Sequence, residues 1–235
     1  SMLPSLSLGD QVLVDKSTFR PRNSRTLRPP SYGDLVVFEH GSKDGKLERL
    51  VKRVIGLPGD LIRMDGSAPI VNGWTIPRCD AGTYANVVDH RNVVGRLVVE
   101  FVGDAWYLTL YGAVPPSSFE EYRVKDGELF VLGDHRADSV DSRAWAVAGG
   151  GAVTDSGVTF DAVKGRVDWH LISTRRSGAL DLSRFLRKPN GQLPIEHVDV
   201  TSLHAGIERC LRSRPVDTQP PKPRPRTLAL LGSRR

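Results

Sequence analysis

The chain has 235 residues, of which 39% are hydrophobic and 26% charged, so it is long enough to bury a sizeable core beneath an ordinary polar surface. Its net charge of +6 comes largely from basic clusters in one early loop and at the C-terminus, and no motif for binding DNA or RNA accompanies them. We therefore expect no nucleic acid among its partners. The six histidines never fall in a metal-ligand spacing, so we also expect no metal and no cofactor.

Residues 1–60 contain three apolar runs that are typical of β-strands, and each lies beside a Gly-Asp pair. The runs are Val12–Val14, Leu35–Phe38 and Leu50–Ile55. The third is rich in β-branched residues and ends at the turn-forming residues 56–59, so it predicts a buried strand followed by a turn.

This third run carries two adjacent cations, Lys52 and Arg53. Because side chains alternate along a strand, the two cations point to opposite faces, and one of them must lie against apolar surface. Burial without a counter-ion lowers the pKa of a lysine and can make it a base near neutral pH, whereas an arginine stays charged. Lys52 is therefore the candidate base, although a single lysine in a strand more often extends its amine to solvent.

Residues 61–124 form a series of short alternating segments with turns at Asp65-Gly66 and Asn72-Gly73. Such dipeptides mark β-hairpins, so we expect an inserted antiparallel β subdomain that takes no part in catalysis.

A further buried strand is predicted at Glu128–Leu132, followed by a loop dense in charges at 133–143, and the stretch Gly165–Ile172 predicts a closing strand. Leu203, Ile207 and Leu211 recur at helical spacing, which predicts a short amphipathic helix over 201–212. The tail from residue 213 is rich in proline and arginine and is expected to be disordered. Two cysteines, Cys79 and Cys210, are compatible with one disulfide or with none.

A possible nucleophile lies at the start of the chain. Pro4 follows Ser1 closely and biases Leu3 to an extended conformation, which could hold the Ser1 hydroxyl in place. A serine needs a base to become nucleophilic, and a desolvated neutral lysine can serve. Ser1 and Lys52 are thus a candidate pair.

Five stretches, taken in chain order, resemble the motif boxes of bacterial type I signal peptidases, which are membrane-anchored serine proteases with a Ser-Lys dyad. The stretches are Ser1-Met2-x-Pro4-Ser5-Leu6, Gly9-Asp10-x-Val12-x-Val14, Gly33-Asp34-Leu35-Val36-Val37-Phe38, Val51-Lys52-Arg53-Val54-Ile55-Gly56-Leu57-Pro58-Gly59-Asp60 and Gly133-Asp134-x-Arg136-x-x-Ser139-x-Asp141-Ser142-Arg143. The lysine box and the last box together are the specific ones. His135 and Ala137 depart from the residues common in this family.

The resemblance implies a role for each matched residue. Ser1 would be the nucleophile, Lys52 the general base, and Ser139 the residue that hydrogen-bonds and orients the lysine amine. The supporting residues would be an ion pair behind the site and two charges that brace the same loop, namely Asp141 with Arg143, and Asp134 with Arg136. The residues that would line the substrate groove are Met2, Val37 and Ile55.

By the same resemblance the substrates are exported preproteins, bound as an added strand and cut after a signal peptide with small residues at positions −1 and −3. The resemblance also implies an upstream membrane anchor, contact with lipid, and a catalytic domain on the outer face of a bacterial cytoplasmic membrane.

Three other readings are open. A terminal serine also occurs in N-terminal-nucleophile hydrolases, but these are layered folds of sheets and helices. A repressor or sensor could use a Ser-Lys dyad once, to cut itself. A pseudoenzyme could bind preproteins without cutting them.

We therefore predict a mainly β fold of two packed antiparallel sheets with a short C-terminal helix. The expected organisation is a catalytic core at 1–60 and 125–190, an inserted subdomain at 61–124, a C-terminal extension at 191–212 and a tail at 213–235.

Overall fold

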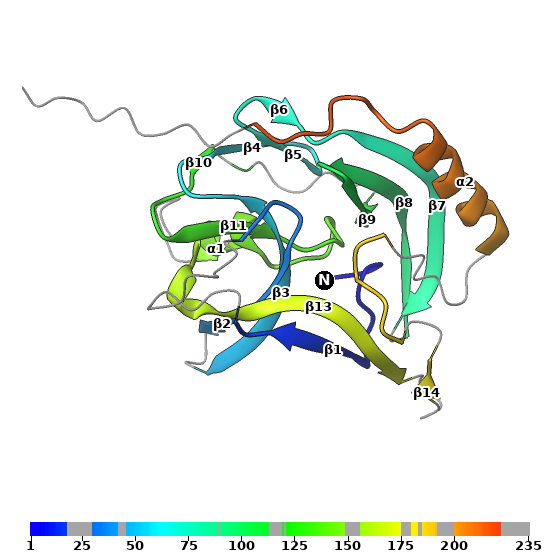
Figure 1. Cartoon of the computed structure of the whole chain (residues 1–235), viewed down its shortest axis with the longest axis horizontal. Helices are drawn as coiled ribbons and strands as arrows, with labels where there is room; N and C mark the ends of the chain where they lie inside the picture. The colour runs from blue at the N-terminus through cyan, green and yellow to red at the C-terminus, as the bar shows by residue number, and fades with distance from the viewer. Residues whose placement is uncertain are drawn as a thin grey trace, which may run out of the picture.

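The computed structural model describes residues 1–17, 30–41, 46–88, 90–112, 119, 121–148, 156–174, 180–182, 185–191 and 200–221. Over these residues the chain is mainly β, and every strand pair is antiparallel (Figure 1). The predicted fold class is confirmed. The described strands form three sheets, and we had expected two packed sheets together with an inserted antiparallel β subdomain.

The largest sheet has seven strands in the order β1-β13-β2-β3-β11-β12, with β14 paired to β13. Its strands are β1 (Asp10–Asp15), β2 (Leu35–Gly41), β3 (Leu47–Gly56), β11 (Glu128–Leu132), β12 (Val158–Thr159), β13 (Val163–Thr174) and β14 (Leu180–Asp181). The three apolar runs of residues 1–60 therefore lie in β1, β2 and β3, as predicted, and the closing strand is β13.

The second sheet has four strands, in the order β10-β4-β5-β6. They are β4 (Leu61–Asp65), β5 (Ala68–Val71), β6 (Trp74–Thr75) and β10 (Tyr122–Arg123). The turn between β5 and β6 is formed by Asn72 and Gly73, with φ angles of 52° and 85°. Two successive positive φ angles are what a tight two-residue hairpin needs, so the predicted turn is confirmed.

The third sheet, β7-β8-β9, is a long twisted ribbon (Figure 1). Its strands are β7 (Arg78–Val88), β8 (Arg91–Val102) and β9 (Ala105–Tyr111). Helix α2 (Val200–Arg212) packs on the ribbon with Leu203 and Ile207 in a shared core, which confirms the predicted helix. A disulfide between Cys79 of β7 and Cys210 of α2 fastens the two elements and settles the pairing that the sequence left open.

Two further helical segments are helix α1 (Ser142–Ala148) and the 3₁₀ helix η2 (Phe160–Ala162). Helix α1 was not expected from the sequence. It begins inside the charged loop that follows β11, and Ser142 Oγ accepts a hydrogen bond from the Val131 N–H at 2.9 Å. This bond ties the end of the loop back to the strand from which the loop departs.

The three sheets share one core. Ile55 and Phe130 of the large sheet pack with Ile62 of the four-stranded sheet and with Val102 and Tyr107 of the ribbon. Residues 61–124 are therefore packed against the large sheet, and a division into domains stays a proposal.

For residues 213–221, within the expected disordered tail, the structure gives defined contacts. Thr218 is buried and exchanges hydrogen bonds with Gly103, including one of 2.7 Å between the Gly103 N–H and the Thr218 carbonyl. The remaining part of that tail, 222–235, lies outside the described residues, as do 192–199 of the expected extension. No helix within the described ranges is long and apolar enough to cross a membrane.

Candidate active site

Strand β3 places Lys52 and Arg53 on opposite faces, and both are buried, with 2% and 0% of their surfaces exposed. We predicted that at least one of these two cations would be buried, and the structure buries both. Burial of a charge is costly unless it is paired or loses its proton, and the two residues meet this cost in different ways.

The Lys52 amine donates a hydrogen bond to Ser139 Oγ at 3.0 Å. Desolvation lowers the pKa of Lys52 from its ordinary value of 10.5, and Arg143 acts in the same direction. The carboxylates of Asp141, Asp134 and Asp138 oppose this shift, but the net direction is downward. Lys52 is thus held against a neutral hydroxyl in a setting that favours its uncharged, basic form.

Ser1 lies at the same place, next to Gly133. The Ser1 carbonyl accepts a hydrogen bond from the His135 N–H at 3.0 Å. A Cβ atom on Gly133 would overlap both Ser139 Oγ and the Ser1 carbonyl oxygen, so this position needs a glycine to let the two segments approach. The three residues Ser1, Lys52 and Ser139 are therefore brought together, with Ser1 itself exposed.

Asp141 and Arg143 form the expected ion pair behind the site. Arg143 donates from Nε and Nη2 to the two carboxylate oxygens of Asp141, both at 2.8 Å. Asp141 also accepts the Gly133 N–H at 3.0 Å. Burial opposes ionisation of this carboxyl, but the hydrogen bonds and charge of Arg143 hold the pKa of Asp141 below its usual range. The pair therefore closes the loop from Gly133 to Arg143 around Ser139.

Asp134 is paired with Arg53, which we had not assigned a role. Arg53 donates from Nε and Nη2 to the carboxylate of Asp134, both at 2.6 Å, and the two side chains are fully buried. The guanidinium also lies 3.8 Å from the centre of the Tyr107 ring and donates to the Gly33 carbonyl and to Asn190. The strand that carries Lys52 is thus tied to the loop that carries Ser139.

Arg136 is paired with Glu100 of the inserted ribbon. The distance from Arg136 Nη2 to the Glu100 carboxylate is 2.7 Å, and both side chains are fully buried. Next to this pair, Leu110 N donates to the Asp134 carbonyl at 2.8 Å and Arg136 N donates to the Leu110 carbonyl at 2.9 Å. The ribbon therefore braces the loop by both side chains and backbone. Glu100 was missed from sequence, although an acid inside the apolar run 97–102 was a usable signal.

A groove of about 500 Å³ opens beside Ser1. Its walls come from the N-terminal segment, from β1 and β3, from the 133–143 loop and from the ribbon. Met2 lines the groove. Val37, which we also expected there, packs in the same apolar cluster as Met2 but is not one of the residues that line the groove. Ile55, which we expected in the groove, lies instead in the core with Phe130 and is 1% exposed.

A second cavity, of about 580 Å³, lies between Trp106 of the ribbon and Trp169 of β13. Although it is the larger of the two, none of the predicted site residues lines it. The chemistry therefore belongs to the groove beside Ser1.

The arrangement has the parts that acyl transfer through a serine requires. It combines an exposed hydroxyl residue, a buried amine with a lowered pKa, a second hydroxyl that fixes this amine, and a groove on the open side. The fold and the site together define a mainly β serine hydrolase as the class to compare.

Comparison with known proteins agrees with this class. A sequence profile for the family described as signal peptidase, peptidase S26, matches residues 1–170. The chain therefore belongs to the signal peptidase family, and the resemblance drawn from its motifs is confirmed.

Among its relatives, signal peptidase I of Pseudomonas fluorescens is 29% identical over 156 residues, which cover 62% of this chain and 52% of that protein. Signal peptidase I of Bacillus caldolyticus is 33% identical over 143 residues, covering 61% and 64%. The chain thus spans about half the length of the first relative and less than two thirds of the second. A crystal structure of signal peptidase I from Enterococcus faecalis is 22% identical, with 60% of this chain and 99% of that chain covered and a TM-score of 0.33. That score is too low to match individual elements.

Proposed function

We propose that this protein is a signal peptidase I, a serine endopeptidase that removes N-terminal signal peptides from exported preproteins. The observation that carries the proposal is Lys52, which is 2% exposed and whose amine has a lowered pKa and donates a hydrogen bond to Ser139 beside Ser1. Family membership and the relatives named signal peptidase I support the same activity.

In the proposed reaction the neutral amine of Lys52 takes the proton of the Ser1 hydroxyl as Ser1 Oγ attacks the scissile carbonyl carbon. The protonated Lys52 then gives this proton to the leaving nitrogen, the peptide bond breaks, and the signal peptide is left as an ester on Ser1. Lys52, neutral again, takes a proton from water as the water oxygen attacks the ester carbon. Lys52 then gives this proton to Ser1 Oγ as the ester bond breaks, which frees Ser1 and releases the signal peptide as a carboxylic acid. Ser139 holds the amine throughout, and the ion pair of Asp141 and Arg143 fixes the loop that carries Ser139.

The proposed substrate binds as an added strand along β3. Residues 47–53 of β3 pair with β2 on one side, whereas β11 reaches only Arg53, Val54 and Gly56 on the other. Within the described part of the chain, residues 47–52 therefore keep an open edge, and Leu50 and Val51 line the groove there. Alternate residues of an extended peptide share one face, so positions −1 and −3 would both turn toward this wall, where small side chains are expected to fit.

The proposed place of action is the outer face of a bacterial cytoplasmic membrane, because preproteins reach the enzyme there. The disulfide between Cys79 and Cys210 supports this location, since disulfides persist in oxidising compartments.

The test is cleavage of a peptide that spans an Ala-x-Ala signal junction. The full-length protein, its Ser1→Ala variant and its Lys52→Ala variant are compared in detergent, with the fold of each checked by circular dichroism. We expect a single cut after the last alanine by the parent protein and none by either variant. Full activity of the Lys52→Ala variant would remove the dyad from the mechanism. A folded parent that cuts no such peptide would favour a self-cleaving or a non-cleaving binding protein.

A further inference from the structure

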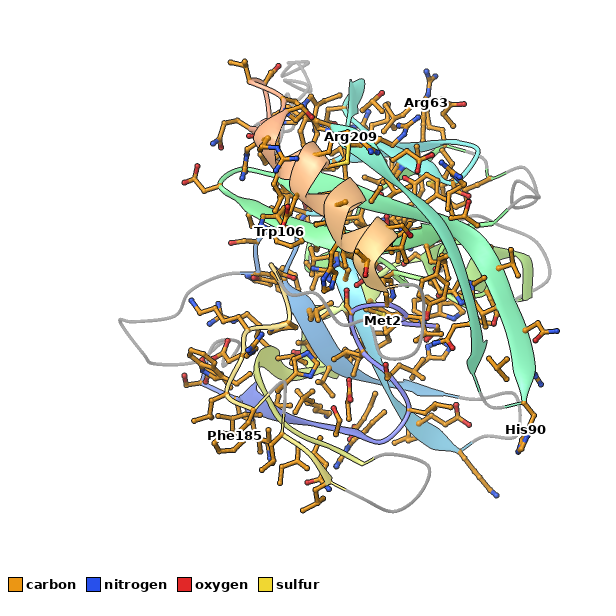
Figure 2. All side chains as sticks on the ribbon, turned by 90° about the vertical axis from the view of Figure 1, so that its right-hand side faces the viewer. Met2, Arg63, His90, Trp106, Phe185 and Arg209 are labelled. Carbon is orange, nitrogen blue, oxygen red and sulfur yellow. A yellow bond between two sulfur atoms is a disulfide. The ribbon has the colours of Figure 1, made fainter. Side chains whose placement is uncertain are left out.

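The inserted ribbon forms part of the groove wall. Arg91 and Val93, at the start of β8, line the groove together with Ser1 and Met2. Arg91 and Val93 share one face of the strand because they are two residues apart. Val94, the residue after Val93, lies on the opposite face and is 64% exposed. Figure 2 agrees with this arrangement, with Met2 between the ribbon and the large sheet, and with His90, the neighbour of Arg91, at the end of the ribbon. Residues 61–124, expected to take no part in catalysis, thus contact the space where a substrate would lie.

A second cation, Arg49 of β3, lines the same groove. Its acidic neighbour Glu39 is already held by Lys164 at 2.8 Å, whereas Arg49 lies 3.6 Å from Glu39 with 77% of its side chain exposed. Arg49 therefore keeps much of its charge available to the groove. For Arg91, which is exposed, no ion pair is found within the described residues.

The acidic residues of the groove do not neutralise these cations. The side chain of Asp10 is 3% exposed, and its carboxylate accepts hydrogen bonds from the Ser7 N–H and from Ser173 Oγ. Asp138 is exposed, but its charge acts on Ser1 and Lys52, at the reacting end of the groove. Arg49 precedes Lys52 by three residues, which in a strand is about 10 Å. The groove is therefore cationic about three substrate residues away from the scissile bond.

We propose that Arg49 and Arg91 select preproteins that carry an acidic side chain three or four residues from the scissile bond. The proposal rests on the proposed function and adds a preference that the small residues at −1 and −3 do not supply. A carboxylate at this distance meets Arg49 on the β3 wall, and Arg91 adds its charge from the ribbon wall of the same groove.

The experiment uses a set of peptides around an Ala-x-Ala junction, with Glu or Gln placed at each position from two to six residues away on either side. The full-length protein, Arg49→Gln, Arg91→Gln and the double variant are compared at low salt. The matched control is Arg63→Gln, an exposed arginine of β4 that lies far from Met2 in Figure 2. We expect the parent and the control to cleave the best Glu peptide about two to five times faster, by kcat/KM, than its Gln partner.

Each single variant should lose part of this ratio and the double variant all of it, and 0.5 M salt should reduce it in the parent because exposed charges are screened. Equal cleavage of Glu and Gln peptides at every position would overturn the proposal. So would a ratio that survives in the double variant.

A binding measurement separates the failure of this proposal from failure of the function. The dissociation constants of the fluorescent Glu and Gln peptides are measured with the Ser1→Ala variant, with and without the two arginine substitutions. If the parent cleaves the peptides but the constants do not depend on Glu, the selection by arginine is wrong and the function stands. If nothing is cleaved but Glu strengthens binding through Arg49 and Arg91, the function is wrong and the acidic contact stands.

Discussion

The two faces of β3 bury two neighbouring cations in opposite ways. On one face Arg53 is matched by a carboxylate, with two hydrogen bonds of 2.6 Å to Asp134, and its remaining groups meet Gly33, Asn190 and the Tyr107 ring. On the other face the hydrogen bond of the Lys52 amine goes to a neutral hydroxyl, that of Ser139, and burial lowers the pKa of the amine.

The difference gives Arg53 a structural role and Lys52 a chemical one. A buried charge that is fully paired stays charged and holds the elements around it in place. A buried amine that lacks a carboxylate within hydrogen-bonding distance moves toward its neutral form, which is the form that can take a proton. Adjacent residues of one strand thus provide the brace and the base, and the same substitution at each should have different consequences.

The largest effect is expected for Lys52→Met. Methionine has a similar length but cannot accept a proton, so kcat/KM for the Ala-x-Ala peptide should fall by roughly 10³-fold or more. The free energy of unfolding should be unchanged or higher, because a desolvated amine is removed. Urea unfolding and a cleavage assay on the same sample measure both. A large loss of stability would mean that Lys52 is a structural residue.

The next effect is expected for Arg53→Met, which leaves the Asp134 carboxylate buried and unpaired. Breaking a buried pair costs about 3–5 kcal/mol of unfolding free energy. The control is Arg63→Met, which breaks the exposed pair with Glu121 at 2.7 Å and should cost about 1 kcal/mol or less. Equal losses in urea unfolding for the two variants would contradict the assignment of Arg53 as a brace.

The sequence predicted the base more fully than the brace. Lys52 and Ser139 both belong to motif boxes of the family, and the resemblance therefore implied the contact between them. In the structure the Lys52 amine lies 3.0 Å from Ser139 Oγ. The partners of Arg53 and Arg136 lie 81 and 36 positions away, and Glu100 belongs to no such box. Pairing at that range is decided by how the sheets pack, which local patterns do not encode.

The same limit applies to the fold. The strands with clear apolar alternation and the Asn72-Gly73 turn were predicted correctly, because these signals are local. Strand β7 was missed because Arg78–Val88 mixes small and polar residues, and its apolar contacts come from α2 and from the disulfide to Cys210, 131 positions away. Helix α1, with seven residues, is too short to show a helical period.

A smaller effect is expected where the two segments of the site approach each other. In Gly133→Ala the added Cβ would overlap Ser139 Oγ and the Ser1 carbonyl, so the loop must shift and Ser139 must move away from Lys52. We expect kcat to fall by roughly 10²-fold and stability to fall by about 1–3 kcal/mol, as for other overpacked sites. The control is Gly66→Ala, at an open turn where no atom lies within 4 Å of the new Cβ. Gly66 has a φ of 57°, so this control measures backbone strain without the overlap.

The smallest effect is the change in cleavage rate expected for each unit of pH. Lys52 acts as a base only when it is neutral, so below its pKa in the folded protein the rate should fall about tenfold for each pH unit. Its pKa lies below 10.5 because of burial, with Asp141, Asp134 and Asp138 opposing and Arg143 assisting the shift. A rate that is unchanged from pH 9 to pH 5 would contradict a lysine base.

Protonation of His135 could also lower the cleavage rate at acid pH. This residue lines the groove, and burial lowers its pKa from 6.5 while Asp138 opposes the shift. In His135→Gln the loss of rate at acid pH should therefore remain if Lys52 is the base.

The free energy of unfolding tests the lowered pKa of Lys52 independently of activity. Between this lowered pKa and 10.5 the unfolded chain binds more protons at Lys52 than the folded protein does, so the free energy of unfolding should rise with pH in that window. Lys52→Met should remove this rise, while Arg53→Met, which replaces a residue that stays charged throughout, should retain it.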